Sequence, residues 1–338
     1  MDFGIFDHVE RKPDRSLADL YRERLALARL ADEVGCFCYH VSEHHGTPLS
    51  MAPSPNVLLA ALAVHTTRIH LGPLGALLPL YEPLRLVEEI CMLDQLSDGR
   101  VELGVGRGVS RIEQKFYNVD TDQSRAMFAE ALEVLTRGLT QPVLDFEGTW
   151  YDYDTVPMEL TPVQRPHPPI WYPTSNLSSV PWVAQMGFNT IFAGELGHVA
   201  EQVAAYTEHL DPARRETARF GIHPFIVVAP TDAEALEVGA AAYHAHHANL
   251  SYLREWHGRT GDLTRTQNLR APATLAEAVE AGWAAAGSPG AVRDQLGDIL
   301  GKTGCNYLLY SPISGNTPVD FAARALELFA AKVLPGLS

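Results

Sequence analysis

Short apolar runs alternate with amphipathic segments along most of the chain, and this alternation limits the folds that the sequence can adopt. The expected strands are Asp2–Phe6, Cys36–Val41, Arg68–Leu78, Arg100–Val105, Ile170–Pro173, Thr190–Ala193, Phe220–Val228 and Asn306–Tyr310. The expected helices are Leu17–Val34, Asn56–His65, Pro83–Leu96, Ser124–Gly138, Ser178–Met186, His198–His209, Asp232–Leu253, Thr274–Ala286, Pro289–Thr303 and Pro318–Leu334. Apolar strands that each precede a helix indicate parallel strands buried on both faces. Eight such units favour an α/β fold of the (β/α)8 barrel type over an open doubly wound sheet.

Two segments interrupt the alternation. Gln141–Pro169, after the fourth expected helix, is rich in Pro, Asp, Tyr and Thr, and we expect an excursion with short β pieces. Arg254–Ala273 is polar and irregular, and we expect a lid that closes over a site. No Gly/Ser-rich linker divides the chain, so residues 1–338 are expected to form a single domain.

Composition bears on partners and compartment. The 338 residues carry a formal charge of −15, which argues against a nucleic-acid partner because a phosphate backbone requires a basic face. No apolar run reaches the roughly 18 residues of a membrane span, and the N-terminus lacks the pattern of a secretory signal. Four cysteines without a CxxC pair suggest reduced structural thiols. We therefore expect a cytoplasmic protein without a membrane partner.

The sequence Ser42-Glu43-His44-His45 directly follows the second expected strand. Such a group in an arbitrary loop is ordinary solvated polarity. In a barrel, however, active sites lie at the carboxyl ends of the strands, so these titratable groups are expected at a catalytic mouth. Strand alternation places Ser42 and His44 on one side and Glu43 and His45 on the other.

Two further histidines, His244 and His247, are spaced one turn apart on an expected helix. We expect a solvated helix face there rather than a metal site, and no metal is assigned.

Two further strand ends indicate an anion site. Arg107 stands between glycines in Gly104–Arg111, where the backbone is accessible and the guanidinium offers a planar set of donors. Tyr172–Val180 is rich in hydroxyl groups just before a helix. Each could be purely structural, but together they favour a phosphate site. Towards the end of the third expected strand, Gly72, Gly75 and Ala76 either leave room for a flat ring or mark a tight corner of the barrel.

Segments spread in order over nearly the whole chain resemble the bacterial luciferase-like flavin-dependent monooxygenases of the luciferase alpha-subunit type. They are SEHH, LGPLGALLPLYEPLRLVEEICMLDQLSDGRVELGVGRG, DQSRAMFAEALEVL, PPIWYPTSN with WVAQMGF, and GSPGAVRDQLGDI. The resemblance implies a (β/α)8 barrel that binds FMN. In it, His44 is similar to the catalytic histidine beside the flavin ring, Arg107 to the main phosphate ligand and Arg125 to a second basic contact.

The resemblance also implies roles for two backbone segments. The residues similar to the family's phosphate-binding turn are Ser175, Asn176, Ser178 and Ser179. Leu74-Gly75 corresponds to an unusual non-prolyl cis peptide bond under the ring. The chain departs from luciferase at Gly106, where luciferase has a reactive cysteine, and at 191–194, which lack its tryptophan. These departures weigh against light emission and long-chain aldehyde specificity.

The function that this resemblance implies is a two-component monooxygenase. A separate flavin reductase supplies reduced FMN, oxygen adds at the flavin C4a position, and the peroxyflavin oxygenates a small organic, mainly apolar substrate. The helix Pro83–Leu96 is apolar on more than one side, which favours a homodimer. The sequence leaves two alternatives open. One is an F420-dependent oxidoreductase on the same barrel. The other is a non-catalytic flavin-binding partner subunit, against which His44 and Arg107 argue.

Overall fold

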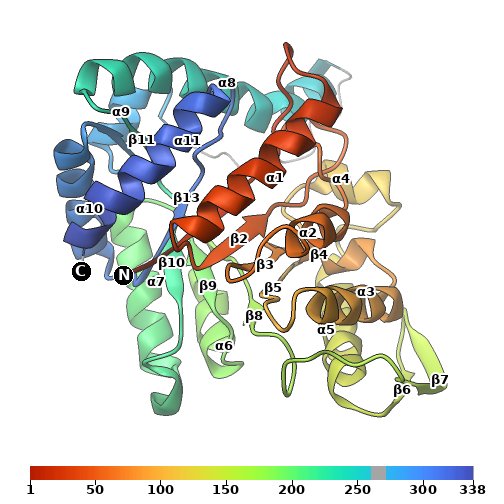
Figure 1. The fold of residues 1–338 in the computed structure, drawn as a ribbon. Helices are drawn as coiled ribbons and strands as arrows, with labels where there is room; N and C mark the ends of the chain where they lie inside the picture. The colour runs from red at the N-terminus through yellow and green to blue at the C-terminus, as the bar shows by residue number, and fades with distance from the viewer. Residues whose placement is uncertain (260–271, 338) are drawn as a thin grey trace.

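The computed structural model describes residues 1–259 and 272–337, and strands alternate with helices through most of them (Figure 1). The strands are β1 (Asp2–Asp7), β2 (Cys38–Val41), β3 (His70–Pro73), β4 (Ala76–Leu77), β5 (Leu103–Gly106), β6 (Val143–Glu147), β7 (Asp152–Pro157), β8 (Ile170–Trp171), β9 (Thr190–Phe192), β10 (Phe220–Ile222), β11 (Phe225–Val228), β12 (Ala284–Gly287) and β13 (Tyr307–Tyr310). The α-helices are α1 (Leu17–Glu33), α2 (Pro55–Ala63), α3 (Pro83–Leu96), α4 (Arg111–Phe116), α5 (Ser124–Thr140), α6 (Val180–Gln185), α7 (Leu196–His209), α8 (Asp232–Arg259), α9 (Leu275–Glu280), α10 (Pro289–Thr303) and α11 (Val319–Leu328).

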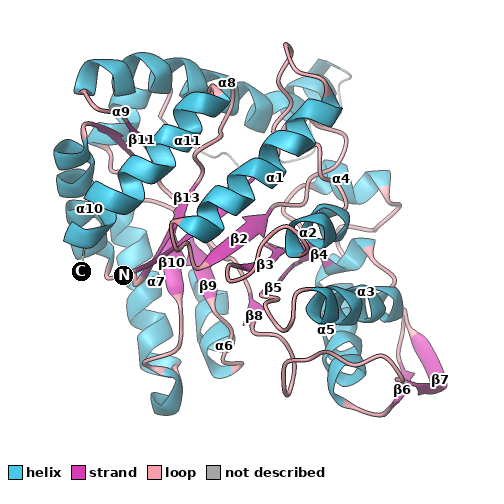
Figure 2. Cartoon of the chain, viewed as in Figure 1, coloured by secondary structure: helices cyan, strands magenta, loops and turns pink. Residues whose placement is uncertain are grey.

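The largest sheet is parallel and has the strand order β3-β2-β1-β13-β10-β9. A second sheet has the order β4-β5-β8, and β6 and β7 form an antiparallel hairpin at the lower right of Figure 1. Single bridges, Leu71 with Val101 and Trp171 with Asn189, connect the first sheet to residues of the second. Helices surround the strands (Figure 2). The observed fold is thus an α/β protein whose parallel sheet forms half of a barrel.

Alternate residues of β13 show how the sheet is buried on both faces. Leu308 and Tyr310 belong to the large hydrophobic core that includes residues of the helices. Tyr307 and Leu309 instead pack in a second cluster with Trp171 and other buried residues, namely Leu74 and Ile191. Because successive side chains point to opposite faces of a strand, the second cluster lies on the inner face of the curved sheet. This filled interior leaves the strand ends as the place for a site.

The seventh expected strand is divided in the structure. Phe220–Val228 forms two strands, β10 and β11. The strand β10 pairs with β9 and β13, whereas β11 pairs with β12. Pro224 lies between the two strands. Proline has no N–H for a strand ladder, so a break in pairing at this point is expected.

The expectation of one helix over Thr274–Ala286 is wrong. The helix α9 ends at Glu280, Gly282 takes a positive φ of 74°, and Ala284–Gly287 forms the strand β12 beside β11. Alanine favours helices, but pairing with β11 and complete burial outweigh this preference. The sequence analysis also missed α4. The excursion over Gln141–Pro169 is confirmed, with β6 and β7 as its β pieces.

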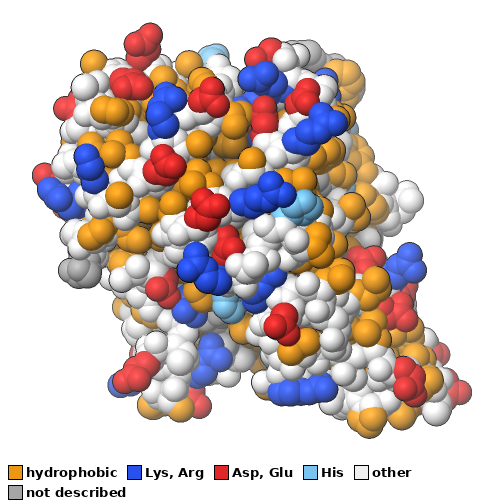
Figure 3. Space-filling model, in the orientation of Figure 1, with side chains coloured by type: hydrophobic (Ala, Val, Ile, Leu, Met, Phe, Trp, Pro, Cys, Tyr) orange, Lys and Arg blue, Asp and Glu red, His pale blue; other side chains and the backbone are white. Residues whose placement is uncertain are grey.

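Two expectations concern the surface and the segment after the seventh strand. Of the lid expected over Arg254–Ala273, residues 254–259 continue α8, and residues 260–271 lie outside the described residues. Among the described helices, none is both long enough and apolar enough to cross a membrane. The face of the molecule in Figure 3 carries acidic, basic and hydrophobic side chains interspersed.

Candidate functional site

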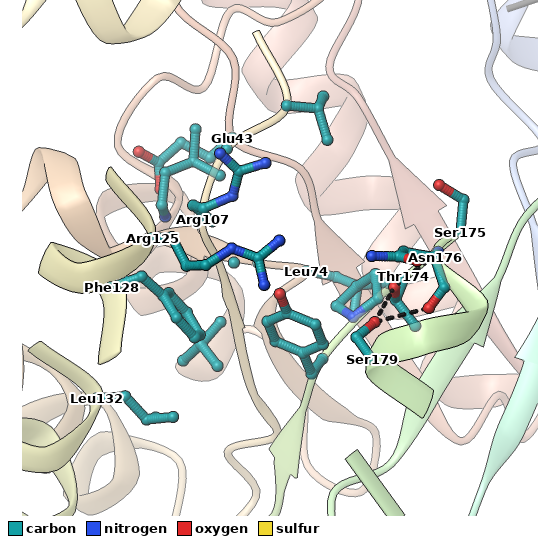
Figure 4. Close-up of a pocket in the computed structure, with 18 of the residues that line it drawn as sticks. Glu43, Leu74, Arg107, Arg125, Phe128, Leu132, Thr174, Ser175, Asn176 and Ser179 are labelled. Atoms are coloured by element: carbon teal, nitrogen blue, oxygen red, sulfur yellow. Dashed lines mark hydrogen bonds between the residues drawn. The ribbon is translucent and has the colours of Figure 1, made fainter. Parts of the chain in front are cut away.

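All of the expected site residues line a single cavity of about 730 Å³ (Figure 4). They are His44, Leu74, Gly75, Arg107, Arg125, Ser175, Asn176, Ser178 and Ser179. The cavity lies at the carboxyl ends of β2, β5 and β8 and against α5. Its volume is within the range of pockets that bind small molecules or cofactors.

His44 follows β2 and is hydrogen-bonded to a carboxylate that the sequence analysis missed. Its Nδ1 donates to Oε1 of Glu113 over 3.2 Å, and the backbone N–H of His45 donates to the same oxygen over 3.1 Å. Glu113 is buried at 2% exposure and belongs to α4, whose N-terminus is capped by Ser110. A carboxylate at Nδ1 fixes the orientation of the ring and leaves Nε2 free for exchange of a proton. The pattern Ser110-x-x-Glu113 is the sequence signal for this helix start.

Glu43 and His45 form a separate buried network. His45 Nε2 donates to Glu43 Oε1 over 2.9 Å, and Tyr81 donates its hydroxyl to Glu43 Oε2 over 2.7 Å. Burial, and after it the Glu43 carboxylate, raises the pKa of Tyr81, so this phenol stays protonated. The expected alternation holds for Ser42 and His44, which line the cavity, and for His45, which does not. It fails for Glu43, which also lines the cavity.

Two guanidinium groups extend into the cavity, as Figure 4 shows. Arg107 follows β5 and donates from Nη1 to Ser124 Oγ over 3.1 Å, whereas Arg125 lies on α5. Burial raises the pKa of Tyr172, and the charges of Arg107 and Arg125 oppose this rise, so the phenol lies within reach of both charges. Two like charges in one cavity repel each other unless an anion binds between them, and a phosphate is such an anion.

The hydroxyl-rich turn lies on another side of the cavity in Figure 4. Thr174 Oγ1 lies 2.9 Å from Ser179 Oγ, and the side-chain oxygen of Asn176 accepts from the backbone N–H and the hydroxyl of Ser178 over 3.1 and 3.0 Å. Ser179 donates its hydroxyl to the Asn176 carbonyl over 2.8 Å. These hydrogen bonds hold the turn in shape. A bound ligand would replace some of them with hydrogen bonds of its own.

Glycines near the cavity play two different roles. The Leu74–Gly75 peptide bond is cis, as the resemblance implied. A Cβ at Gly75 would lie 2.8 Å from the Val105 backbone, so glycine is required here for close packing of neighbouring segments. A Cβ at Gly106 would meet nothing closer than Leu77 Cδ2 at 3.7 Å, so glycine at this position leaves open space beside Arg107. The tight-corner interpretation of the third strand end therefore holds for Gly75, which also lines the cavity.

Part of the cavity wall is apolar, and sequence patterns gave no signal for most of it. The wall includes Phe6, Leu77, Val105, Phe128, Leu132, Trp182 and Met186. These side chains come from several separate elements, so only the fold brings them together. Among residues 1–259 and 272–337, no group of three or more His, Cys, Asp or Glu side chains is placed to hold a metal ion.

A family model named "Luciferase-like monooxygenase" matches residues 1–306. The uncharacterised protein y4wF of Sinorhizobium fredii is 37% identical over 321 residues, which cover 94% of this chain and 92% of that protein. The oxygenase component of a flavin-dependent trigonelline monooxygenase of Acinetobacter baylyi is 28% identical over 192 residues, 56% of this chain and 53% of that protein. Among solved structures, the monooxygenase RslO1 from Streptomyces bottropensis matches with a TM-score of 0.86 and 27% identity over 100% of both chains.

Proposed function

The chain belongs to the luciferase-like monooxygenase family, and from this premise we propose that it is the oxygenase of a two-component system that uses reduced FMN and O2. It adds one oxygen atom to a small organic, mainly apolar substrate. The observation that carries the proposal is the convergence of His44, both arginines and the hydroxyl-rich turn on one cavity. The flavin dependence of the trigonelline monooxygenase component supports it.

The same proposal extends to the architecture. The eight strands β1, β2, β3, β5, β8, β9, β10 and β13 form a (β/α)8 barrel, and residues 1–338 form one domain. The bridges between β3 and the segment before β5, and between β8 and the segment before β9, support a closed ring of strands. In such a barrel the cavity occupies the usual position of an active site.

The residues of the cavity fit FMN. Arg107 and Arg125 would hold the phosphate, with Ser175, Asn176, Ser178 and Ser179 as further donors. The backbone of Leu74 and Gly75 would support the flat ring. The open space at Gly106 adds room in the cavity beside Arg107.

The protein side chains would control protons and water rather than electrons. Bound reduced flavin supplies the electrons that activate O2 and the route by which one oxygen atom reaches the substrate. His44, oriented by Glu113, would give and take a proton at Nε2, the usual role of an imidazole in acid–base chemistry. The apolar wall, with Phe6 and Phe128 among its residues, would limit water, which favours transfer to the substrate over loss of hydrogen peroxide.

We also propose two protein partners. A separate flavin reductase supplies reduced FMN, which the name "oxygenase component" of the Acinetobacter relative supports. A second copy of the chain forms a homodimer through α2 and α3, which contact each other. Large apolar side chains are exposed there, Val57 at 72% on α2, Val64 at 64% just after it and Met92 at 55% on α3. Hydrophobic side chains are visible over this region in Figure 3.

The test is an anaerobic titration of the purified protein with reduced FMN and, separately, with reduced F420. We expect tight binding of FMN, followed on admission of O2 by consumption of oxygen and by an oxygenated product from a panel of apolar substrates. Binding of F420 with hydride transfer and no oxygen uptake would replace the proposal with the oxidoreductase alternative. Binding of flavin without product or oxygen uptake would favour the non-catalytic subunit.

A further inference from the structure

A second series of polar side chains reaches the cavity at Ser42. Ser42 lines the cavity beside His44, and its Oγ lies 2.9 Å from Nδ1 of His8. His8 follows β1 and is buried, with 9% of its surface exposed. The serine hydroxyl therefore has an imidazole directly behind it, on a path separate from the His44–Glu113 pair.

His8 lies at the centre of four imidazoles, which we call the histidine cluster: His8, His44, His223 and His246. The ring centroid of His8 lies 5.7 Å from that of His44, 5.6 Å from that of His246 and 6.4 Å from that of His223. The four come from the ends of β1, β2 and β10 and from α8. Phe6, which lines the cavity, packs with its ring centroid 4.6 Å from that of His8, so the cluster adjoins the cavity wall.

Each imidazole of the cluster is held through one ring nitrogen. Besides the bonds of His8 and His44, His223 Nε2 bonds to Ser311 Oγ over 2.8 Å, and His246 Nδ1 bonds to Glu10 Oε1 over 2.7 Å. Within the part of the chain that the structure describes, the second nitrogen of each ring has no hydrogen bond to the protein. Rings that are anchored at one nitrogen and free at the other are suited to passing protons.

Glu10 sets the direction of the hydrogen bonds. Its carboxylate also accepts from Asn249 Nδ2 over 2.6 Å and from the backbone N–H of Gly315 over 2.9 Å. Burial raises the pKa of Glu10, but the charge and hydrogen bond of His246, with the bonds from Asn249 and Gly315, lower it overall. An ionised carboxylate only accepts, so His246 donates from Nδ1, and in the tautomer of a neutral imidazole that this bond selects the other nitrogen, Nε2, is an acceptor.

The same reasoning assigns the proton of His8. Burial, and after it the effect of any proton taken up by His246, His44 or His223, holds the pKa of His8 well below its ordinary value, so the ring is neutral. A neutral imidazole has one donor and one acceptor nitrogen. The arrangement that uses the acceptor on His246 has His8 protonated at Nε2 and accepting the Ser42 hydroxyl at Nδ1. The lone pairs of Ser42 Oγ are then available to the cavity.

We propose that Ser42 is a second proton-exchanging residue of the site and that His8 and His246 connect it to Glu10. Ser42 Oγ takes a proton from an O–H or N–H of the bound molecule as its own proton passes to His8 Nδ1. The Nε2 proton of His8 passes through one water molecule to His246 Nε2, which leaves an imidazolium beside the Glu10 carboxylate. The 5.6 Å between ring centroids suits such a water bridge. The reverse sequence returns the proton, so only O–H and N–H bonds change.

The first test needs no cofactor and no activity. In cofactor-free protein with ¹⁵N-labelled histidine at pH 7, nuclear magnetic resonance reports which ring nitrogen carries the proton. We expect His8 to be protonated at Nε2 alone and His246 at Nδ1, with resonances assigned by their loss in His8→Asn and His246→Asn. A His8 ring protonated at Nδ1, or a His8 imidazolium, would overturn the proposal. The result of this test does not depend on the proposed function. Only the identity of the bound molecule in the proposal depends on that function.

The second test uses variants with reduced FMN and O2. His8→Asn keeps an acceptor for the Ser42 hydroxyl but does not reach His246, and Ser42→Ala removes the cavity end. Both should lower the ratio of product to hydrogen peroxide at least about tenfold without changing FMN affinity, as expected for loss of a proton-exchanging group. Ser42→Thr, which keeps a hydroxyl, should recover most of the loss.

The matched control is His247→Asn, the same substitution one residue further along α8. His247 packs against Tyr243 with ring centroids 4.6 Å apart and does not line the cavity, so this variant should behave as the parent does. An unchanged ratio in Ser42→Ala would show that Ser42 and His8 only pack the site. If the parent protein itself forms no product, the proposed function is wrong. The positions of the ring protons on His8 and His246 would still test the proposal about Ser42.

Discussion

Arg107 and Arg125 bring two positive charges into one cavity of a protein whose formal charge is −15. Replacing Arg107 by alanine removes one charge-assisted set of donors to a phosphate. We expect FMN affinity to fall about tenfold to a thousandfold, since such sheltered bonds contribute about 2–4 kcal/mol. Fluorescence quenching of FMN on titration measures the change.

Arg111 provides the control for this substitution. It lies on α4, four positions after Arg107, with its guanidinium 3.9 Å from the exposed Asp122 carboxylate and outside the cavity wall. Arg111→Ala should leave FMN affinity unchanged. Equal affinities for Arg107→Ala and the parent would remove Arg107 from the phosphate site.

In the proposed function, His44 exchanges protons and does not hold the cofactor. His44→Ala should therefore bind FMN as the parent does and lose oxygen transfer by about two to four orders of magnitude, the usual contribution of a positioned acid–base group. Reduced flavin would instead be consumed to hydrogen peroxide. The ratio of product to peroxide at saturating reduced FMN is the measurement, and a ratio equal to that of the parent would make His44 structural.

At the scale of elements, the cavity depends on how closely β4 and β5 approach each other. A Cβ at Gly75 would lie 2.8 Å from the Val105 backbone, and one at Gly106 would lie 3.7 Å from its nearest neighbour. Gly75→Ala should lower the free energy of unfolding by about 1–3 kcal/mol through overpacking. Gly106→Ala should change it by less than about 0.5 kcal/mol. Urea unfolding of the two variants compares them directly, and equal stabilities would contradict the packing role of Gly75.

The carboxylate of Asp32 joins α1 to the start of β3. It accepts from the backbone N–H groups of Thr67, Arg68 and Ile69 over 2.8, 2.9 and 2.6 Å. Burial raises the pKa of Asp32, but these bonds outweigh it, so the pKa is lowered overall. Stabilisation is then present above the unfolded-state pKa of about 3.9 and is lost as the pH falls through the lower folded value.

Asp32→Asn should consequently cost about 1–3 kcal/mol of unfolding free energy at pH 7. The difference from the parent should shrink as the pH falls below about 4, because the parent then loses the same charge. Urea unfolding at several pH values measures both effects. A difference that stays constant down to pH 3 would show that the charge of Asp32 does not contribute.

Elements with a strong local pattern could be predicted from the sequence, and elements defined by tertiary contacts could not. The helix α10 has proline at its start and Gly304 at its end, and it spans the expected Pro289–Thr303. The strand β12 consists of alanines and a glycine and exists because β11 lies beside it. The site shows the same division. Arg107 followed from its glycine neighbours and His44 from its strand end, whereas Glu113 depended on the short helix α4.

On the scale of the whole molecule, the exposed apolar side chains of α2 and α3 predict self-association. Val57→Lys and Met92→Lys place charges on this surface without altering the cavity wall. We expect the parent to have the mass of a dimer by light scattering at micromolar concentration and the double variant that of a monomer. Leu236, exposed at 46% on α8, is a control position for the same substitution. A monomeric parent would contradict the homodimer.

The pairing of β1 with β13 has a consequence for synthesis of the protein in the cell. Asp2 pairs with Tyr307, whereas the cavity wall is drawn from Phe6 to Met186. At about 5–20 residues per second, the ribosome needs about 15–60 seconds to make the roughly 300 residues between these two strands. Every side chain that would hold the cofactor is thus outside the ribosome before the sheet can be completed. If these side chains bind flavin while β1 still has one free edge, a richer supply of flavin during translation should raise the yield of folded protein.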